Sequence, residues 1–292
     1  MRAYDWMVKY TQQRDWIEKK GLFLWLALFF GGVGSGLYIV SLWFNSFWGM
    51  SIGWLTVVLL KGGTHMADLG HPLRFWRGIL RPQTSWISRG LIAMALFGFL
   101  GALQLIFSYL LPGSSAELIL KILSGVTALV VATYTGFMLT YIIGIPFWNN
   151  GLMPILFLSS SITRGFALLL AISLVGGGGI PVETVQTGTR FMLLTTTVLL
   201  TTYLWSGSYA MAASRFSVME LLKGGTATLF WVGVVVCSIL IPGGISSYSF
   251  LAGEIAHSIL FFSIICEMVG ELSLRYCFLK VGVYSPLVPV HS

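Results

Sequence analysis

The chain has 292 residues, of which 56% are hydrophobic and only 9% are charged, and its formal net charge is +7. An ordinary soluble domain carries about a quarter charged residues, so this composition excludes that class. The composition also excludes a disordered regulator, and the lysines and arginines lie between apolar segments, which excludes a nucleic-acid-binding face. The 34 glycines fit a chain surrounded by membrane lipid, where helices contain more glycine than in water.

The first 20 residues form a segment that carries Trp6, Tyr10 and Trp16 among alternating charges. An interfacial helix anchored by aromatic rings and an arm that docks a partner both explain this pattern, so residues 1–20 are predicted to be an interfacial or docking segment. The apolar run that starts at Gly21 is too long for the core of a signal peptide and lacks a small-residue cleavage site. It is therefore interpreted as helix 1 of the mature protein.

Eight apolar segments follow, each close to the 20 or so residues that a membrane-spanning helix needs. They cover residues 21–44, 46–64, 86–111, 116–147, 151–176, 185–212, 226–243 and 248–273. The tight turn at 147–151 separates two groups of four. The sequence thus predicts an all-α polytopic membrane protein with eight transmembrane helices arranged as two four-helix bundles. The predicted parts are helices 1–4 in residues 21–148, helices 5–8 in 149–275 and a C-terminal tail in 276–292.

Lysine and arginine gather on one side of this eight-span arrangement. Both termini and the loops after spans 2, 4 and 6 share that side, which holds fourteen of the cationic residues, Lys61 among them, while Lys121 and Arg190 lie near the other side. The positive-inside rule therefore predicts that both termini are cytoplasmic. A basic loop that docks an acidic partner would produce the same bias.

The most informative stretch is residues 65–90, HMADLGHPLRFWRGILRPQTSWISRG, which joins helices 2 and 3. Long loops in a compact protein are usually functional or disordered, and the tryptophan and proline here argue against disorder. Docking of a partner or contact with a cofactor is the favoured interpretation, and anchoring in lipid headgroups is the alternative. The candidate docking residues are Arg74, Arg77, Arg81, Trp86 and Arg89.

Helices 1–4 are predicted to be almost free of interior charge, as an apolar ligand pocket requires. Gly32 and Gly36 form a GxxxG pattern, for which close packing of a neighbouring helix is the favoured use. His65 and Asp68 lie three residues apart and so share one helical face, where a histidine–carboxylate pair can exchange protons near neutral pH. A helix-end cap with a salt bridge to a nearby arginine explains them equally well.

Helices 5–8 contain ionisable residues at membrane depth, which mark functional sites by default. Arg164 lies deep in helix 5, His257 is expected at a similar depth in helix 8, and serine and threonine runs accompany them. We interpret these residues as a proton pathway, whereas buried ion pairs that fix helix packing are a slightly favoured alternative. The pathway candidates are Arg164, Arg190, Glu254, His257, Glu267 and Glu271.

Four elements in chain order resemble the NrfD/PsrC family, the membrane subunits of polysulfide-reductase-type complexes. They are the loop at 65–90, the glycine-rich GGVGSGLY at 31–38, TYTG at 133–136 and PFWN at 146–149. The resemblance implies a prokaryotic inner-membrane subunit that holds menaquinone or ubiquinone among its first four helices. It also implies a ferredoxin-like iron–sulfur partner subunit, which connects to a molybdopterin or other catalytic subunit.

The resemblance assigns the family's quinone-contacting tyrosine to Tyr134. On spacing alone, a backbone carbonyl is an equal partner for its hydroxyl. Where the polysulfide reductase subunit has a histidine near the start of helix 1, residues 22–28 offer only Trp25. The candidate quinone-binding residues are therefore Tyr134 and Trp25, with His65 and Asp68 in place of the missing histidine.

The chain is thus predicted to pass electrons between an iron–sulfur partner and the quinone pool, with proton translocation as an accompanying activity and without a catalytic centre of its own. Neither haem nor metal is expected in it, because only four histidines occur and the three cysteines form no cluster. The alternatives are a secondary transporter or proton channel, and a passive anchor that binds no quinone. The family's known catalytic subunits lie outside the cytoplasmic membrane, whereas the charge bias places the 65–90 loop inside.

Overall fold

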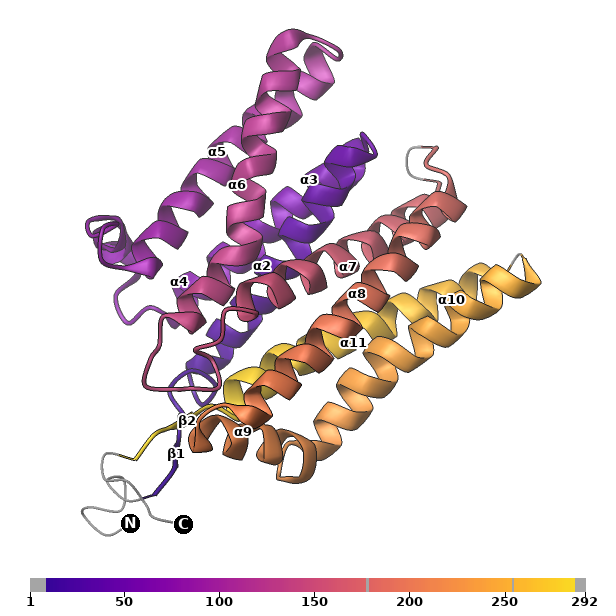
Figure 1. Ribbon diagram of the computed structural model, residues 1–292. Helices are drawn as coiled ribbons and strands as arrows, with labels where there is room; N and C mark the ends of the chain where they lie inside the picture. Colours follow the sequence, from indigo (N-terminus) through magenta and orange to yellow (C-terminus); the bar gives the residue numbers. More distant parts are fainter. Residues whose placement is uncertain (1–8, 177–178, 254, 287–292) are drawn as a thin grey trace.

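The computed structural model describes residues 9–176, 179–253 and 255–286. In this part of the chain, long helices lie side by side, with α5 and α6 at one edge and α10 at the other (Figure 1). The helices are α2 (Gly21–Trp43), α3 (Phe47–Leu55), the π-helix η1 (Thr56–Lys61), α4 (Gly62–Asp68), the 3₁₀ helix η2 (Pro72–Ile79), α5 (Trp86–Leu110), α6 (Ser115–Thr140), α7 (Met153–Leu174), α8 (Val182–Tyr209), α9 (Ala212–Lys223), the π-helix η3 (Leu229–Leu240), α10 (Ile241–Ala252) and α11 (His257–Lys280).

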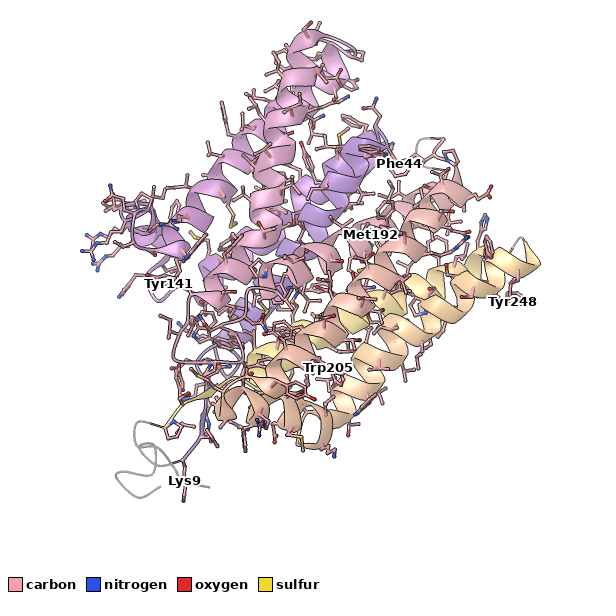
Figure 2. All side chains as sticks on the ribbon, viewed as in Figure 1. Lys9, Phe44, Tyr141, Met192, Trp205 and Tyr248 are labelled. Carbon is pink, nitrogen blue, oxygen red and sulfur yellow. The ribbon has the colours of Figure 1, made fainter. Side chains whose placement is uncertain are left out.

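Among the described residues, six helical segments are long and apolar enough to cross a membrane: α2, α5, α6, α7, the run Leu229–Leu251 and α11. Large apolar side chains are exposed on the helices, among them Tyr141, Trp205 and Tyr248, which Figure 2 labels and which are each more than 60% exposed. The prediction of a multi-pass, mainly helical membrane protein is therefore confirmed. The helical run 47–68 and α8 occupy the second and sixth predicted spans, and the eight-span, two-bundle arrangement stays a prediction.

Serine side chains begin three of the helices. Ser46, Ser85 and Ser114 each accept a hydrogen bond from the backbone N–H three residues later, at 3.3, 3.3 and 3.2 Å. Each cap gives an acceptor to a backbone N–H of the first helical turn, which has no partner within the helix, whereas N–H groups further along are already bonded to carbonyls of the same helix.

The centre of the molecule is the contact between α2 and α7. Each is 61% buried over its most apolar stretch, compared with 28% for α5 and α6. A Cβ placed on Gly36 would overlap the Ser161 carbonyl oxygen, and one on Gly165 would overlap the Gly36 carbonyl oxygen. Only glycine permits this approach of two backbones, so the packing interpretation of Gly36 is confirmed.

The predicted ends of the last two spans were wrong. Pro242 and the glycines after it were expected to end the seventh span, but the helix continues from η3 through α10 to Ala252. Proline is tolerated because it stands in the first turn of α10, directly after a π-helical stretch that alters the hydrogen-bond register. The chain turns instead at Gly253, whose φ of +86° suits glycine, and α11 begins at His257.

The described part of the N-terminal segment forms a strand and turns rather than an interfacial helix. Strand β1 (Thr11–Gln12) pairs antiparallel with β2 (Val283–Tyr284), which follows α11. Tyr10 stacks on Phe216 of α9 with ring centroids 5.1 Å apart. Trp6 lies outside the described residues. In residues 9–20 the alternative of an interfacial helix is wrong, because this part of the chain pairs with β2 and packs on α9, and the docking alternative stays a prediction.

Replacing Gly36 with alanine is expected to separate α2 from α7, because its methyl group would overlap the Ser161 carbonyl. Overpacking of this kind costs about 1–3 kcal/mol in unfolding free energy. Thermal unfolding of the detergent-purified protein measures the loss as a lower Tm. Gly244→Ala in α10 is the matched control, since a Cβ there meets nothing within 4 Å. Equal melting temperatures for the two variants would contradict the close-contact interpretation.

Candidate functional site

Tyr134 lies buried between three helices of the N-terminal half. Its side chain projects from α6, and its ring packs so closely on the backbone of α5 that a Cβ on Gly90 would overlap Tyr134 Cε2. The Lys61 ammonium, from the end of η1, lies 4.5 Å from the centroid of the same ring. The residue that the family resemblance singles out is thus held in a glycine-lined contact beside a buried cation.

Lys61 is the residue that sequence reasoning missed, since the distribution of lysine and arginine assigns it to the basic surface. The structure leaves only 1% of it exposed and gives its Nζ no hydrogen-bond partner within the described residues. The prediction that helices 1–4 are almost free of interior charge is therefore wrong at this position. The signal was present in the sequence, because Lys61 lies inside the apolar segment 46–64.

The other predicted quinone contacts are divided between two places. His65 and Asp68 stand on α4, directly after Lys61, and both are half-buried. Trp25 instead faces α11, where its Nε1 donates to the Leu272 carbonyl at 2.9 Å and its ring packs edge-on against Tyr276. The described contacts thus join Lys61 with Tyr134 and place Trp25 against another helix.

The connection between α4 and α5 exposes both charge and apolar surface. Arg74, Arg77 and Arg81 are exposed, and Leu73 is 91% exposed in the same short η2 segment. Figure 2 shows nitrogen-bearing side chains projecting outward from this end of α5. Exposed large apolar side chains beside arginines are typical of a protein or headgroup contact surface.

Trp86 and Arg89, by contrast, hold this connection in place. The Trp86 ring stacks on Phe137 of α6, with centroids 5.1 Å apart and planes 5° from parallel. Arg89 lies 4.6 Å from the centroid of the Trp86 ring and donates to the carbonyls of Pro82 and Gln83 at 2.7 and 2.8 Å. These contacts position the connection, and the docking role of Trp86 and Arg89 stays a prediction.

A chain of buried charges crosses the C-terminal half. Arg164 of α7 bonds Glu267 at 2.5 Å and approaches Glu271 at 3.6 Å, and Glu271 bonds Arg275 at 2.7 Å. All four residues are at most 2% exposed. Burying a single charge in a membrane costs on the order of 3 kcal/mol even on the lower scales, so each of these charges depends on its partner.

Hydroxyl groups and an aromatic ring complete this network. Ser238 of η3 accepts a hydrogen bond from Arg164 at 2.6 Å, and Ser160 of α7 accepts one from Arg275 at 2.8 Å. The Arg275 guanidinium also lies 3.6 Å from the centroid of Phe157. With two arginines and two glutamates, the network is formally neutral, and it links α7, η3 and α11.

Two other members of the predicted pathway, Arg190 and His257, do not join the network. Arg190 bonds Ser246 at 3.1 Å and lies over Phe250, both in α10. His257 is exposed at the first residue of α11, so the depth expected for it was wrong, because that helix begins nine residues later than predicted. Glu254 lies outside the described residues.

The PFWN element anchors the end of α11. The Trp148 side chain is fully buried and donates from Nε1 to the Phe278 carbonyl at 2.7 Å, while its ring packs against Trp16. The Tyr203 hydroxyl donates to the Phe147 carbonyl. The family resemblance in this element therefore reflects a structural requirement.

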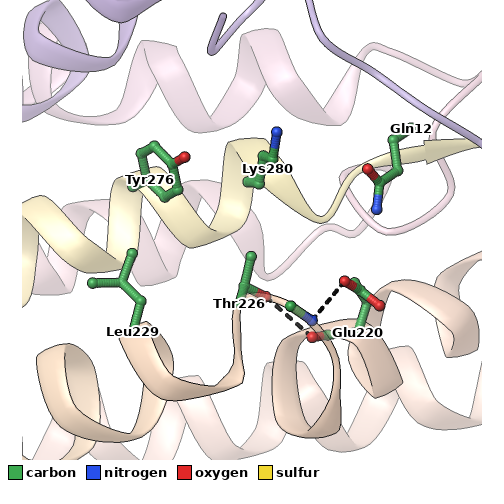
Figure 3. A pocket seen from close by; sticks show the side chains of 7 residues that line it. Gln12, Glu220, Thr226, Leu229, Tyr276 and Lys280 are labelled. Carbon is green, nitrogen blue, oxygen red and sulfur yellow. Dashed lines mark hydrogen bonds between the residues drawn. The ribbon is translucent and has the colours of Figure 1, made fainter.

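Two cavities in the described part of the chain are lined by residues other than Tyr134. One, of about 310 Å³, is lined by Gln12 and by residues of α9, η3 and α11, among them Glu220 and Lys280 (Figure 3). In it, Glu220 accepts a hydrogen bond from the Gly225 backbone at 2.8 Å. The other lies beside Arg190 and Phe250. Neither is lined by a predicted quinone-binding residue.

Comparison with known proteins finds relatives and a family model that match more than half of this chain. It is 28% identical to the C subunit of polysulfide reductase from Wolinella succinogenes over 247 residues, which cover 74% of this chain and 75% of that relative. It is 28% identical to the NrfD homologue of Haemophilus influenzae over 178 residues, 58% of this chain and 53% of that protein. The family model described as polysulphide reductase, NrfD, matches residues 20–286. Because this match covers most of the 292 residues, the chain belongs to the NrfD family.

Proposed function

We propose that the chain is the quinone-interacting membrane subunit of a respiratory oxidoreductase and that it passes electrons between an iron–sulfur partner subunit and the quinone pool. NrfD-family subunits are quinone-interacting electron-transfer proteins that associate with iron–sulfur and catalytic subunits. The observation that carries the proposal for this chain is the buried Tyr134 beside Lys61, in the half of the molecule that also presents the arginine-bearing connection.

The residues around Tyr134 fit a quinone head group. A quinone ring is flat and apolar and carries two carbonyl oxygens, so it needs apolar walls and a few donors. Lys61 supplies a buried ammonium without a hydrogen-bond partner in the described chain, and Tyr134 supplies a phenol. Gly31 and Gly90 keep the backbone close to these two side chains, since a Cβ on either would overlap them.

The chain's own residues have separate tasks in this proposal. A bound quinone supplies the two-electron chemistry. Tyr134 orients the ring, and His65 and Asp68, half-buried between Lys61 and the loop, exchange protons with the surface. Arg74, Arg77 and Arg81 hold the partner against the connection that leads to α5. Both menaquinone and ubiquinone have the carbonyl pair that these groups recognise.

Tyr134→Phe is expected to lower quinone-coupled turnover of the purified complex about tenfold, because one donor to a carbonyl oxygen is lost. Steady-state assays with a water-soluble quinone analogue measure this loss, and partner content by gel densitometry should stay unchanged. Tyr209→Phe is the matched control, since that side chain is 74% exposed on α8. Equal turnover in both variants would remove Tyr134 from the proposed site.

Reversing the charge of Arg74, Arg77 and Arg81 to glutamate is expected to release the partner. Affinity purification of the tagged chain from its native membranes should then lose the broad visible absorbance of an iron–sulfur protein. A control with Arg215→Glu and Lys223→Glu changes two exposed cations of α9 instead. If the absorbance persists with the triple variant, the partner docks elsewhere, and if it is absent from the unaltered chain, the transporter alternative gains support.

We further propose that the Arg164–Glu267–Glu271–Arg275 network carries protons during turnover. The specific observation in favour is that four ionisable groups form a connected chain at membrane depth. The competing explanation is a set of ion pairs that only fixes helix packing, and the two explanations differ in what a neutral replacement does.

Glu267→Gln leaves Glu271 alone to balance both Arg164 and Arg275, so one buried positive charge is uncompensated and the unfolding free energy is expected to fall by about 3–5 kcal/mol. The neutral double variant Arg164→Met/Glu267→Met should restore the Tm, because neither charge remains. The complex that contains the double variant is reconstituted in liposomes with a trapped pH-sensitive dye. If the network carries protons, this complex transfers electrons without the change in internal pH that the wild-type complex produces. Retention of that pH change would assign the network to packing alone.

A further inference from the structure

Lys61 differs from every other buried cation of the described chain in having no anionic partner. Arg164 and Arg275 bond the carboxylates of Glu267 and Glu271, whereas Lys61 is 1% exposed and its Nζ has no hydrogen bond. Among the described residues, the other buried side-chain nitrogen and oxygen atoms without hydrogen bonds are two serine hydroxyls and the Arg164 Nε and Glu271 Oε2 atoms, which face each other at 3.6 Å. Lys61 is therefore the single uncompensated charge in this buried set.

The backbone is arranged to admit this lysine. A Cβ on Gly31 of α2 would lie 2.5 Å from Lys61 Nζ, so only glycine leaves room for the ammonium at that place. Lys61 is also the last residue of the π-helix η1, which interrupts the helical run 47–68. Single π-helical turns inside α-helices are rare and occur frequently at functional sites.

The neighbours of Lys61 make an unpartnered ammonium more costly. Gly32, the next residue of α2, lies against Arg275, where a Cβ would be 3.2 Å from Nη2. Lys61 and Arg275 thus lie against successive glycines of the same helix, and two cations so placed repel each other. The ring of Tyr134, 4.5 Å away, offers only a cation–π contact, which does not replace a hydrogen-bond acceptor.

We propose that Lys61 is a quinone-recognition residue, whose ammonium donates a hydrogen bond to a carbonyl oxygen of the head group held at Tyr134. A carbonyl oxygen is a hydrogen-bond acceptor that a neutral lipophilic ligand can bring to this depth without a charge of its own. This inference rests on the proposed function, because it names a further contact of the same site.

The test is equilibrium binding of 2-heptyl-4-hydroxyquinoline N-oxide, a fluorescent quinone analogue, to the full chain in lipid nanodiscs. Lys61→Met is expected to raise the Kd about tenfold, the amount that a hydrogen bond from a charged donor contributes. Because methionine removes an uncompensated charge, the Tm of the unliganded variant should be equal to or above that of the wild type. Lys223→Met, an exposed lysine of α9, is the control and should change neither value.

Three outcomes would overturn the proposal. Unchanged affinity for Lys61→Met, with weakened binding by Tyr134→Phe, leaves the quinone site in place and removes Lys61 from it. Weaker binding together with a lower Tm assigns Lys61 a structural role. A wild-type chain that does not bind the analogue overturns the proposed function itself.

Discussion

The backbone contact between α2 and α7 positions the buried polar groups of both halves of the molecule. Gly36 and Gly165 let the main-chain atoms of the two helices come into direct contact, and this brings the polar residues of α7 against α2. In lipid, helices gain little from burying apolar side chains, so close van der Waals packing at small residues has to supply the association. Helix α2 also contains Gly31 and Gly32, which make room for Lys61 and for Arg275, respectively.

The buried charges on one side of the α2–α7 contact are paired, whereas the buried lysine on the other side is not. In the C-terminal half, Arg164 and Arg275 are paired with Glu267 and Glu271. Removing any one of these side chains leaves a buried charge without its compensating partner. In the N-terminal half, Lys61 has no such partner among the residues that the structure describes. An unmatched charge lowers the stability of the resting protein, and such a cost is typical of a position retained for binding a ligand rather than for folding.

Several residues that looked functional in the sequence serve the architecture. Trp148 holds the end of α11 through the Phe278 carbonyl, and Trp86 packs against both Phe137 and Arg89. A large aromatic ring near a membrane boundary fills space between helices and also offers a polar edge, so a motif alone does not distinguish anchoring from ligand contact. The exposed arginines of the connection between α4 and α5 are the part of that motif free to meet a partner.

Local sequence determined the mainly helical membrane fold and the approximate positions of its long helices. It also determined the depth of Arg164 and the glycine contact of α2, because apolar length and small-residue spacing act within one segment. Only the tertiary structure decided that Lys61 is buried against Tyr134, that Arg164 pairs with Glu267 of a distant helix, and that Trp25 faces α11. The tertiary structure also places His257 at the first residue of α11, because the helix breaks at Gly253 rather than at Pro242. Each of these outcomes depends on which helix lies beside which, and the pattern along a single helix does not contain that information.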